Sequence, residues 1–353
     1  MSRQGATGTS SAQLARDTLT VEVPATSANV GVGFDCLGLA LDLMARFCFE
    51  PADELLIDGC PERFRGQDNL VWTSYLEACR RLCSRPLTPH ITIDSPIPLS
   101  GGLGSSSACV VAGVVAAQEL NGAGLDARQA LDIACELEGH PDNVAPAILG
   151  GLVSSFVDQG RAHPVRLDVA QNVSFVAIAP PYEVRTADAR RVMPEQVSLK
   201  TTVWQVGHCV AAVRALEQGD LELFSAASRD RLHEPFRARL IPDYEALRRT
   251  ALAAGAAAFL ISGSGSTMLA VCDGRPLAEH VAASVEGMVE NHVDGLWVRV
   301  LSSSPAGVRV LSSSPAGVRV LRERPRASRC KHPRRTPNAD YMGGPGDVPG
   351  TIG

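Results

Sequence analysis

The residues best suited to bind a ligand lie in one loop, residues 96–108 (PIPLSGGLGSSSA), which contains three glycines and four serines and leads directly into an apolar stretch. Glycine lets the backbone approach an anion closely, and the first N–H groups of a following helix point at that anion with the positive end of the helix dipole. The Walker pattern GxxxxGK[ST] needs a lysine that is absent here. The loop therefore predicts phosphate binding of another type, with a flexible connection as the alternative.

The elements around this loop mix helix and strand. Residues 105–120 are rich in Ala and Val and predict a buried helix, and the hydrophobic periodicity favours further helices at 71–83, 127–138, 203–216, 221–232 and 244–254. Strand patterns occur at 19–23, 47–57, 90–93, 150–156, 173–179, 258–262 and 267–271. Because helices and strands do not alternate regularly, we predict an α+β fold.

The composition excludes several classes of protein. The chain has 353 residues, of which 45% are hydrophobic and 20% charged, so it is long enough for two domains with large cores. Its formal net charge of −5 gives no overall field that would attract nucleic acid or an anionic membrane. Ten cysteines without paired CxxC units indicate reduced thiols, and residues 1–20 lack the apolar run of a signal peptide. We expect a cytoplasmic protein with no membrane or nucleic-acid partner.

The two ends of the chain differ in composition from the middle. Residues 1–17 are rich in Ser, Thr and Gln, and predict a disordered leader. Residues 301–310 (LSSSPAGVRV) recur unchanged as 311–320, which is too short and too few copies for a solenoid and favours a simple duplication. Residues 322–353 are rich in Pro, Gly and Arg, so we expect a disordered tail. Its arginines leave nucleic-acid binding as an alternative that deleting the tail would test.

Four segments, in order, resemble the conserved motifs of the GHMP kinases. The loop at 98–108 is similar to the family's PxxxGLGSSA phosphate loop, and residues 23–38 (VPATSANVGVGFDCLG) resemble the opening motif. Residues 138–151 (EGHPDNVAPAILGG) resemble a substrate-site segment, and 262–267 (SGSGST) resemble the third motif, with Ser266 in place of its usual proline. These segments span about 21–271, and the tail from Ser312 has no counterpart in the family.

The resemblance implies a two-domain GHMP kinase with the active site between the domains. It implies an N-terminal ATP-binding domain of the ribosomal-S5-like type at residues 18–165 and a ferredoxin-like C-terminal domain at 166–311. The repeat and basic tail then occupy 312–353. A homodimer is a further expectation carried by the resemblance alone.

The resemblance also implies that ATP and Mg²⁺ bind at the loop. Asn69 would lie near the base, and the phosphates would lie on Pro98, Leu99, Ser100, Gly101, Gly102, Leu103, Gly104, Ser105, Ser106, Ser107, Ala108, Gly263 and Gly265. Magnesium needs at least one carboxylate besides phosphate oxygens. We expect Ser106 and Glu136 as its ligands, with Asp132 and Glu138 as alternatives to Glu136 and an exposed acidic helix face as the alternative to any such role.

The substrate implied by the resemblance is the amino acid L-homoserine, phosphorylated on its side-chain hydroxyl. Asn29 and Asp35 match residues that hold the amino acid, and an aspartate suits its ammonium group. Arg190 and Arg237 match positions that grip the carboxylate, which a guanidinium can do with two hydrogen bonds. Without the resemblance both would be interpreted as surface arginines.

The remaining site residues concern the reacting hydroxyl. The resemblance places Thr186 beside this hydroxyl, so we expect Asp142, Thr186 and Arg190 to be catalytic. His140 and Asp142 lie in a Gly/Pro-bounded turn, where they could meet a substrate group. Asp142 is expected first to bind substrate and second to accept a proton, because phosphoryl transfer can proceed by positioning and charge neutralisation. Capping of the turn by its carboxylate is the alternative role.

Two other functions remain possible from the sequence. A GHMP kinase acting on mevalonate, a sugar or a shikimate-like alcohol would leave Asp35 buried and unpaired. A nucleotide-binding regulatory protein that has lost catalysis is the second possibility, and only an activity measurement separates it from an enzyme.

Overall fold

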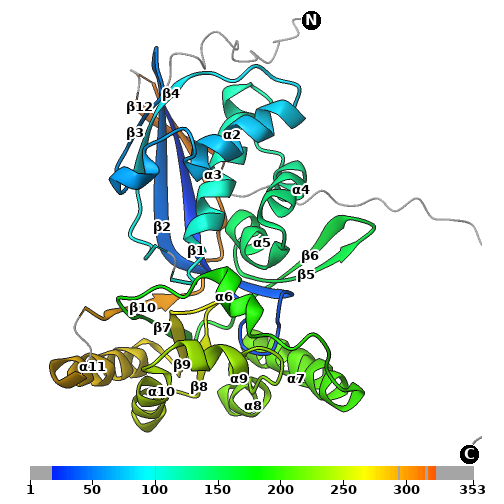
Figure 1. Cartoon of the computed structure of the whole chain (residues 1–353), viewed down its shortest axis with the longest axis vertical. Coiled ribbons are helices and arrows are strands. Elements are labelled where there is room, and N and C mark those ends of the chain that lie inside the picture. Colours follow the sequence, from blue (N-terminus) through cyan, green and yellow to red (C-terminus); the bar gives the residue numbers. More distant parts are fainter. Residues whose placement is uncertain (1–17, 100, 293–294, 315–316, 323–353) are drawn as a thin grey trace, which may run out of the picture.

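The computed structural model describes residues 18–99, 101–292, 295–314 and 317–322, which form two units with one β-sheet each (Figure 1). Within these residues one sheet has eight strands and the other has four. Helices pack on both sheets, and the prediction of an α+β fold is confirmed. In this described part of the chain, no helix is both long and apolar enough to span a bilayer.

The first sheet is built around β2, a long strand that pairs with three others. Its strands are β1 (Thr18–Ala28), β2 (Leu37–Pro51), β3 (Leu56–Asp58), β4 (Pro89–Asp94), β5 (Leu152–Asp158), β6 (Arg161–Leu167), β11 (Arg309–Ser314) and β12 (Gly317–Arg322). The order is β12-β11-β1-β2-β4-β3, and β5 pairs with the start of β2 and with β6. The sequence predicted one strand at 47–57, which covers only the last third of β2 and joins it to β3, and it missed the first part of β2 although Leu alternates there at 37, 39, 41 and 43.

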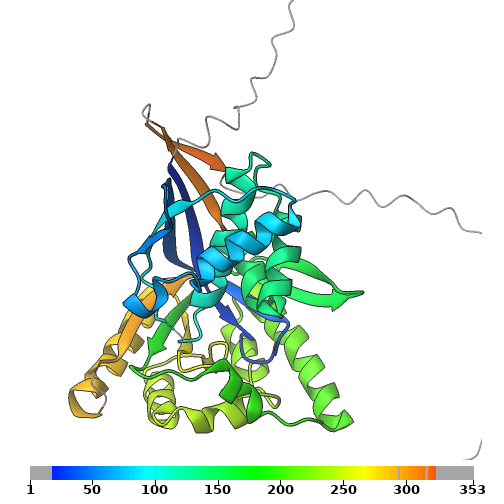
Figure 2. The ribbon, with the colours of Figure 1, turned by 45° about the horizontal axis from the view of Figure 1, so that its top comes forward.

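Four helices cover one face of this sheet in both views (Figures 1 and 2). They are α2 (Leu70–Arg81), α3 (Ser105–Leu120), α4 (Ala127–Glu138) and α5 (Pro141–Leu149), with a 3₁₀ turn, η1 (Glu62–Phe64), before α2. As predicted, α3 is buried along nearly its whole length. Gly113 lets α2 approach α3 closely, because a Cβ there would lie 2.4 Å from the Val71 carbonyl oxygen.

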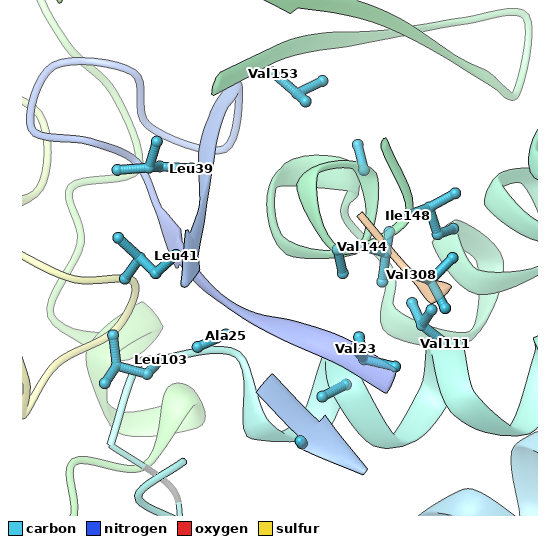
Figure 3. Packing of buried hydrophobic residues seen from close by; sticks show 14 of the residues in the cluster. Val23, Ala25, Leu39, Leu41, Leu103, Val111, Val144, Ile148, Val153 and Val308 are labelled. Carbon is cyan, nitrogen blue, oxygen red and sulfur yellow. The ribbon is translucent and has the colours of Figure 1, made fainter. Parts of the chain in front are cut away.

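The core of the first unit lies between this sheet and these helices. Val23 and Ala25 of β1 and Leu39 and Leu41 of β2 are fully buried. Figure 3 shows Val23 on the side of Val111 of α3, whereas Leu39 and Leu41 extend to the side away from Val144 and Ile148 of α5. Burying such side chains contributes about 1.5–3 kcal/mol each and is the main term that stabilises the sheet-on-helix arrangement. The same core holds β1 in place, and β1 carries the first residues of the motif at 23–38 and ends just before Asn29.

The second unit contains an antiparallel sheet of order β10-β7-β9-β8. Its strands are β7 (Val173–Ala179), β8 (Ala258–Ile261), β9 (Met268–Asp273) and β10 (Trp297–Ser302). Its helices are α6 (Thr186–Arg191), α7 (Leu199–Gln218), α8 (Leu221–Ala227), α9 (Glu234–Arg237), α10 (Tyr244–Ala253) and α11 (Arg275–His292), with the 3₁₀ turn η2 (Ala238–Leu240). The predicted helix 221–232 ends early at Ala227, because the Asp230 carboxylate accepts backbone N–H groups of the turn before α9.

After β10 the chain returns to the first sheet. We expected the C-terminal domain to end at residue 311 and the tail to begin at residue 312, but residues on both sides of this boundary belong to one strand of the first sheet. Strand β11 crosses that boundary and pairs antiparallel with β1, with Val310 opposite Val21 and Leu311 opposite Thr20. The cause is the apolar alternation of the repeat, since Val308 and Val310 of its first copy are buried in the first core. The second copy continues into β12, while the predicted leader 1–17 and the tail 323–353 lie outside the described residues.

Candidate active site

Residues of both units line one cavity of about 630 Å³. Most of the predicted site residues line it, namely Asn29, Asp35, Asn69, Leu99, Gly102, Gly104, Ser105, Ser106, Ser107, His140, Asp142, Thr186, Arg190, Arg237 and Gly263. This volume is in the range of sites for small metabolites and nucleotides. Segments separated by more than 200 residues in the sequence therefore meet in one site.

The glycines of the phosphate loop are required by its close packing. Gly104 caps the start of α3 with φ 69°, and a Cβ there would lie 2.0 Å from Thr26 Oγ1. Gly102 has φ 84°, and a Cβ there would lie 2.3 Å from the Ser262 carbonyl oxygen. Both positions combine a left-handed backbone with no room for a side chain. The loop is thus shaped to present backbone groups.

The third motif holds this loop from the second unit. Thr267 N–H donates to the Gly101 carbonyl at 2.8 Å, and the Ser262 hydroxyl donates to the Gly102 carbonyl at 2.6 Å. Ser266, which stands where the family usually has proline, donates its hydroxyl to the Tyr182 carbonyl at 2.5 Å. These bonds fix the loop before any nucleotide binds.

The carboxylate at the phosphate loop is Glu138 and not the expected Glu136. Glu138 accepts hydrogen bonds from Ser106 Oγ at 3.2 Å and from Ser107 Oγ at 2.6 Å. Glu136 does not line the cavity and forms an ion pair with Arg81 of α2. Residues two apart on a helix point in nearly opposite directions, so only one of the two can face the loop.

The fit of this group to a magnesium ion can be judged from its donors. A serine hydroxyl and one carboxylate, completed by phosphate oxygens and water, are the ligands that Mg²⁺ prefers. Among the described residues no three His, Cys, Asp or Glu side chains gather into a complete metal site. Ser106 and Glu138 therefore fit a magnesium ion that is bound together with phosphate oxygens.

Asp142, which is buried, and His140, which is partly exposed, form a pair at the start of α5. The exposed fraction of Asp142 is 2%, and its Oδ1 lies 2.5 Å from His140 Nδ1. This hydrogen bond to the carboxylate is the main reason why the pKa of His140 is raised. Gly38 of β2 lets α5 begin here, because a Cβ at this residue would lie 1.7 Å from the Asp142 carbonyl oxygen.

Asp35 and Arg190 face each other across the two units. Arg190 Nη1 and Nη2 lie 3.1 and 3.2 Å from the two carboxylate oxygens of Asp35, a bidentate ion pair. Asn29 orients the loop, since its Oδ1 accepts the Asp35 N–H and its Nδ2 donates to the Gly263 carbonyl. Both predicted anchors for an amino acid thus lie in the cavity, bonded to each other.

Arg237 is a buried cation beside this pair. Its exposed fraction is 3%, its guanidinium lies 5.0 Å from the centre of the Phe34 ring, and its Nη1 donates to the Gly263 carbonyl at 2.7 Å. Burial lowers the pKa of Arg237, although a guanidinium remains charged at neutral pH. Its Nε has no hydrogen-bond partner among the described residues. Arg237 therefore retains donor capacity for an anionic ligand.

A group of apolar side chains provides a different environment in the same cavity. Its members are Phe47, Cys60, Phe64, Leu70, Ile93 and Leu99. Asn69 lies next to this group, but its side chain caps α2 by accepting the Val71 N–H at 2.9 Å and donates to the Phe64 carbonyl at 2.7 Å. Such a surface suits the flat face of a nucleotide base.

Some predicted ATP residues do not line this cavity. Pro98 and Gly101 line a neighbouring hollow, Leu103 and Ala108 are buried, Gly265 lies in the third motif, and Ser100 is outside the described residues. Other lining residues were not predicted: Cys109, Asn143, Glu183, Val184, Arg185 and Ser264. Asn143 adjoins Asp142 in its motif, which is a signal in the sequence, whereas 183–185 belong to no motif.

Comparisons with known proteins agree with this geometry. The model of the GHMP kinases N terminal domain matches residues 69–151, and that of the GHMP kinases C terminal domain matches 212–291. A homoserine kinase of Clostridium botulinum (strain ATCC 19397 / Type A) is 38% identical over 250 residues, which cover 70% of this chain and 84% of the relative. The chain belongs to the homoserine kinases of the GHMP kinase family.

Other relatives extend this result. A homoserine kinase of Synechococcus sp. (strain RCC307) is 37% identical over 286 residues, covering 76% of this chain and 90% of the relative. The crystal structure of homoserine kinase from Cytophaga hutchinsonii superposes with a TM-score of 0.76 at 32% identity, covering 84% of this chain and 98% of that chain. A mevalonate kinase of L. major, at 15% identity and a TM-score of 0.61, shares the fold alone. The chain is thus an ATP-dependent kinase of this family.

Proposed function

We propose that this enzyme transfers the γ-phosphoryl group of ATP to the side-chain hydroxyl of L-homoserine, giving O-phospho-L-homoserine and ADP for threonine biosynthesis. The observation that carries the proposal is the set of opposite charges in one cavity with the phosphate loop: Asp35, Arg190 and Arg237. An amino-acid zwitterion needs an acidic and a basic anchor. A carboxylate substrate without an ammonium group would draw Arg190 away from Asp35 and supply no cation in its place.

ATP would lie along the phosphate loop with its base on the apolar group next to Asn69. The N–H groups at the start of α3 and the Ser105–Ser107 hydroxyls would contact the phosphates, as the helix dipole favours. Mg²⁺, when bound, would neutralise phosphate charge. Ser106 and Glu138 would hold it, which transfers to Glu138 the role expected of Glu136.

Binding of L-homoserine would break the ion pair between Asp35 and Arg190 and give each of the two residues a new partner. Its ammonium group would replace the guanidinium at Asp35, while its carboxylate would bind Arg190 and Arg237. Asp142 and Thr186 would then lie near the side-chain hydroxyl, and Asp142 would orient this hydroxyl for attack. As phosphoryl transfer proceeds, the hydroxyl proton leaves to the Asp142 carboxylate or to water, with positioning supplying most of the rate gain.

The experiment that tests this function is ADP release from Mg-ATP with L-homoserine, mevalonate, L-serine and galactose offered separately. We expect turnover of L-homoserine, lowered in Asp142→Asn and Arg190→Ala. Arg191→Ala is the matched control, since Arg191 is an exposed neighbour that pairs with Asp188 and does not line the cavity. Turnover of another alcohol instead would contradict the substrate, and ATP binding without any turnover would favour a regulatory protein.

A homodimer would be formed through helix α7. Leu199, Val203, Val206 and Val210 are all more than half exposed, and their 4-3-4 spacing produces an apolar seam of the coiled-coil type. A Cβ at Gly207 would meet nothing within 4 Å, so a second helix can approach closely there. Two copies packed antiparallel would cover this seam on both.

Light scattering after gel filtration tests the dimer. We expect twice the mass of one chain for the wild type and a single-chain mass for Val206→Glu. Val157→Glu is the control, because this valine on β5 is equally exposed, at 59% against 60%, outside the seam. Dissociation by both variants, or by neither, would contradict the α7 interface. We place the enzyme in the cytoplasm with no nucleic-acid or membrane partner, because its two substrates are cytoplasmic metabolites.

A further inference from the structure

A second cavity lies in the C-terminal unit, among α8, α9, α10 and the start of β8. Its volume is about 680 Å³, comparable to that of the active-site cavity, and it shares no lining residue with it. Tyr244 and Phe259 pack edge to face in its wall with ring centres 5.7 Å apart, and both are more than nine-tenths buried. Leu252 and Ile241 complete an apolar surface, as in many small-molecule sites.

Three arginines surround this apolar surface, namely Arg229, Arg239 and Arg248. Among the described residues, none of the three has a carboxylate within ion-pair distance. The carboxylates that face the same cavity are Asp230, Glu234 and Glu245. The two carboxylate oxygens of Asp230 are already bonded to Gln205 and to backbone N–H groups.

Glu234 is a buried carboxyl group at the bottom of this cavity. Its Oε1 accepts the Ile261 N–H at 2.7 Å, and its residue is 9% exposed. Burial raises the pKa of Glu234 to about 8, so the group is largely protonated at neutral pH. A protonated carboxyl is a hydrogen-bond donor. The cavity therefore presents three guanidinium groups and the Glu234 carboxyl beside an apolar wall, with the Glu245 carboxylate also in its lining.

Helix α9 connects this cavity to the active site. Glu234 at its start lines the second cavity, and Arg237 at its end lines the active site. The residue before Glu234, His233, is fully buried and lies with Nε2 2.7 Å from the Gly31 carbonyl oxygen in the loop that carries Asp35. Glu234 accepts its hydrogen bond from the Ile261 N–H. The next residue, Ser262, donates its hydroxyl to the Gly102 carbonyl of the phosphate loop. A displacement of α9 would thus reach Arg237 and the substrate loop.

We infer that the second cavity binds a small organic anion with an apolar body, and that its occupancy alters the affinity of the active site for the amino-acid substrate through α9. The anionic group would bind Arg248 with Arg229 and Arg239, the apolar body would lie against Tyr244 and Phe259, and Glu234 would donate a hydrogen bond. The effect on substrate affinity rests on the proposed function, whereas binding to the cavity does not.

Calorimetric titration tests the binding. The probes are phenyl phosphate and phenylacetate, which distinguish a phosphate from a carboxylate, with benzyl alcohol as the probe without charge and inorganic phosphate as the probe without apolar body. The phosphate loop is blocked by a saturating non-hydrolysable ATP analogue with Mg²⁺. We expect at least one of the two aromatic anions to bind more tightly than both control probes.

The variant Arg248→Gln should weaken this binding about tenfold, the loss of roughly one charge-assisted hydrogen bond. The control is Arg249→Gln, which alters the next residue of α10, exposed and outside the cavity lining. Arg239→Gln provides a second variant should Arg248→Gln not fold. Equal affinity in the cavity variants and the control, or no binding of either aromatic anion to the wild type, would overturn the site.

Steady-state kinetics tests the coupling. With the bound probe at saturation, the KM for L-homoserine should change about fivefold or more, and that for ATP should change less. An unchanged KM for L-homoserine with a bound probe would overturn the coupling. Should L-homoserine prove not to be a substrate, the calorimetric result on the cavity would be unaffected, so the two failures are distinguishable.

Discussion

The phosphate side and the substrate side of the active site are built differently. On the phosphate side, glycines and backbone groups are fixed by hydrogen bonds from the second unit, such as Thr267 N–H to the Gly101 carbonyl. On the substrate side, the main contact is an ion pair between Asp35 and Arg190, whose side chains remain about 35% and 43% exposed. The nucleotide site is therefore preformed, whereas the amino-acid site is held by charges that must exchange partners when substrate binds.

The largest effect should come from adding a side chain to the preformed phosphate loop. In Gly104→Ala, a Cβ would collide with Thr26 Oγ1 at a residue with positive φ. We expect kcat/KM for ATP to fall by about 10² or more, because a misplacement of about 1 Å has that effect on positioning. Gly160→Ala is the control, since Gly160 also has positive φ but a Cβ there would meet nothing within 4 Å. Equal losses in both would show that backbone strain alone is responsible.

The next effect separates two glutamates of one helix. Glu138→Gln should lower kcat by roughly 10–10² and raise the Mg²⁺ concentration needed for half-maximal activity, because it removes the carboxylate next to Ser106. Glu136→Gln should leave the Mg²⁺ requirement unchanged, since its carboxylate pairs with Arg81. Titration of activity with MgCl₂ measures both. A Mg²⁺ requirement shifted by Glu136→Gln and not by Glu138→Gln would reverse the assignment.

These glutamates show how far the sequence could predict the site. Three of the four motifs located the phosphate loop, Asp35 and Asp142, because each motif carries its chemistry in adjacent residues. Arg190 and Arg237 lie outside the four motifs and were predicted only from positions matched by the family resemblance. The sequence did not decide between Glu136 and Glu138, since the choice depends on how α4 is rotated against α3 in three dimensions. For the same reason, the return of β11 to β1 and the cavity behind α9 were not predicted, because each joins segments that are far apart in sequence.

The smallest effect concerns stability on the substrate side. The pKa of His140 is raised in the folded state by its hydrogen bond to Asp142. A raised pKa means that the folded protein binds the proton more tightly, so this stabilisation is present below the unfolded pKa of about 6.5 and is lost as the pH rises through the folded value. The Tm difference between wild type and His140→Asn should therefore be largest near about pH 5.5 and shrink above pH 7. A Tm difference that grows with pH would contradict stabilisation by the hydrogen bond between His140 and Asp142. His163→Asn is a control at an exposed strand.

The measurement that tests the central claim most directly is ³¹P NMR of the products formed from Mg-ATP with L-homoserine and with 4-hydroxybutyrate, which has the same hydroxyl and carboxylate but no ammonium group. The account predicts O-phospho-L-homoserine from the wild type, with kcat/KM about 10² lower for 4-hydroxybutyrate, and loss of this preference in Asp35→Ala. Equal phosphorylation of both substrates by the wild type, or a preference that persists without Asp35, would contradict recognition of the zwitterion by Asp35 and the two arginines.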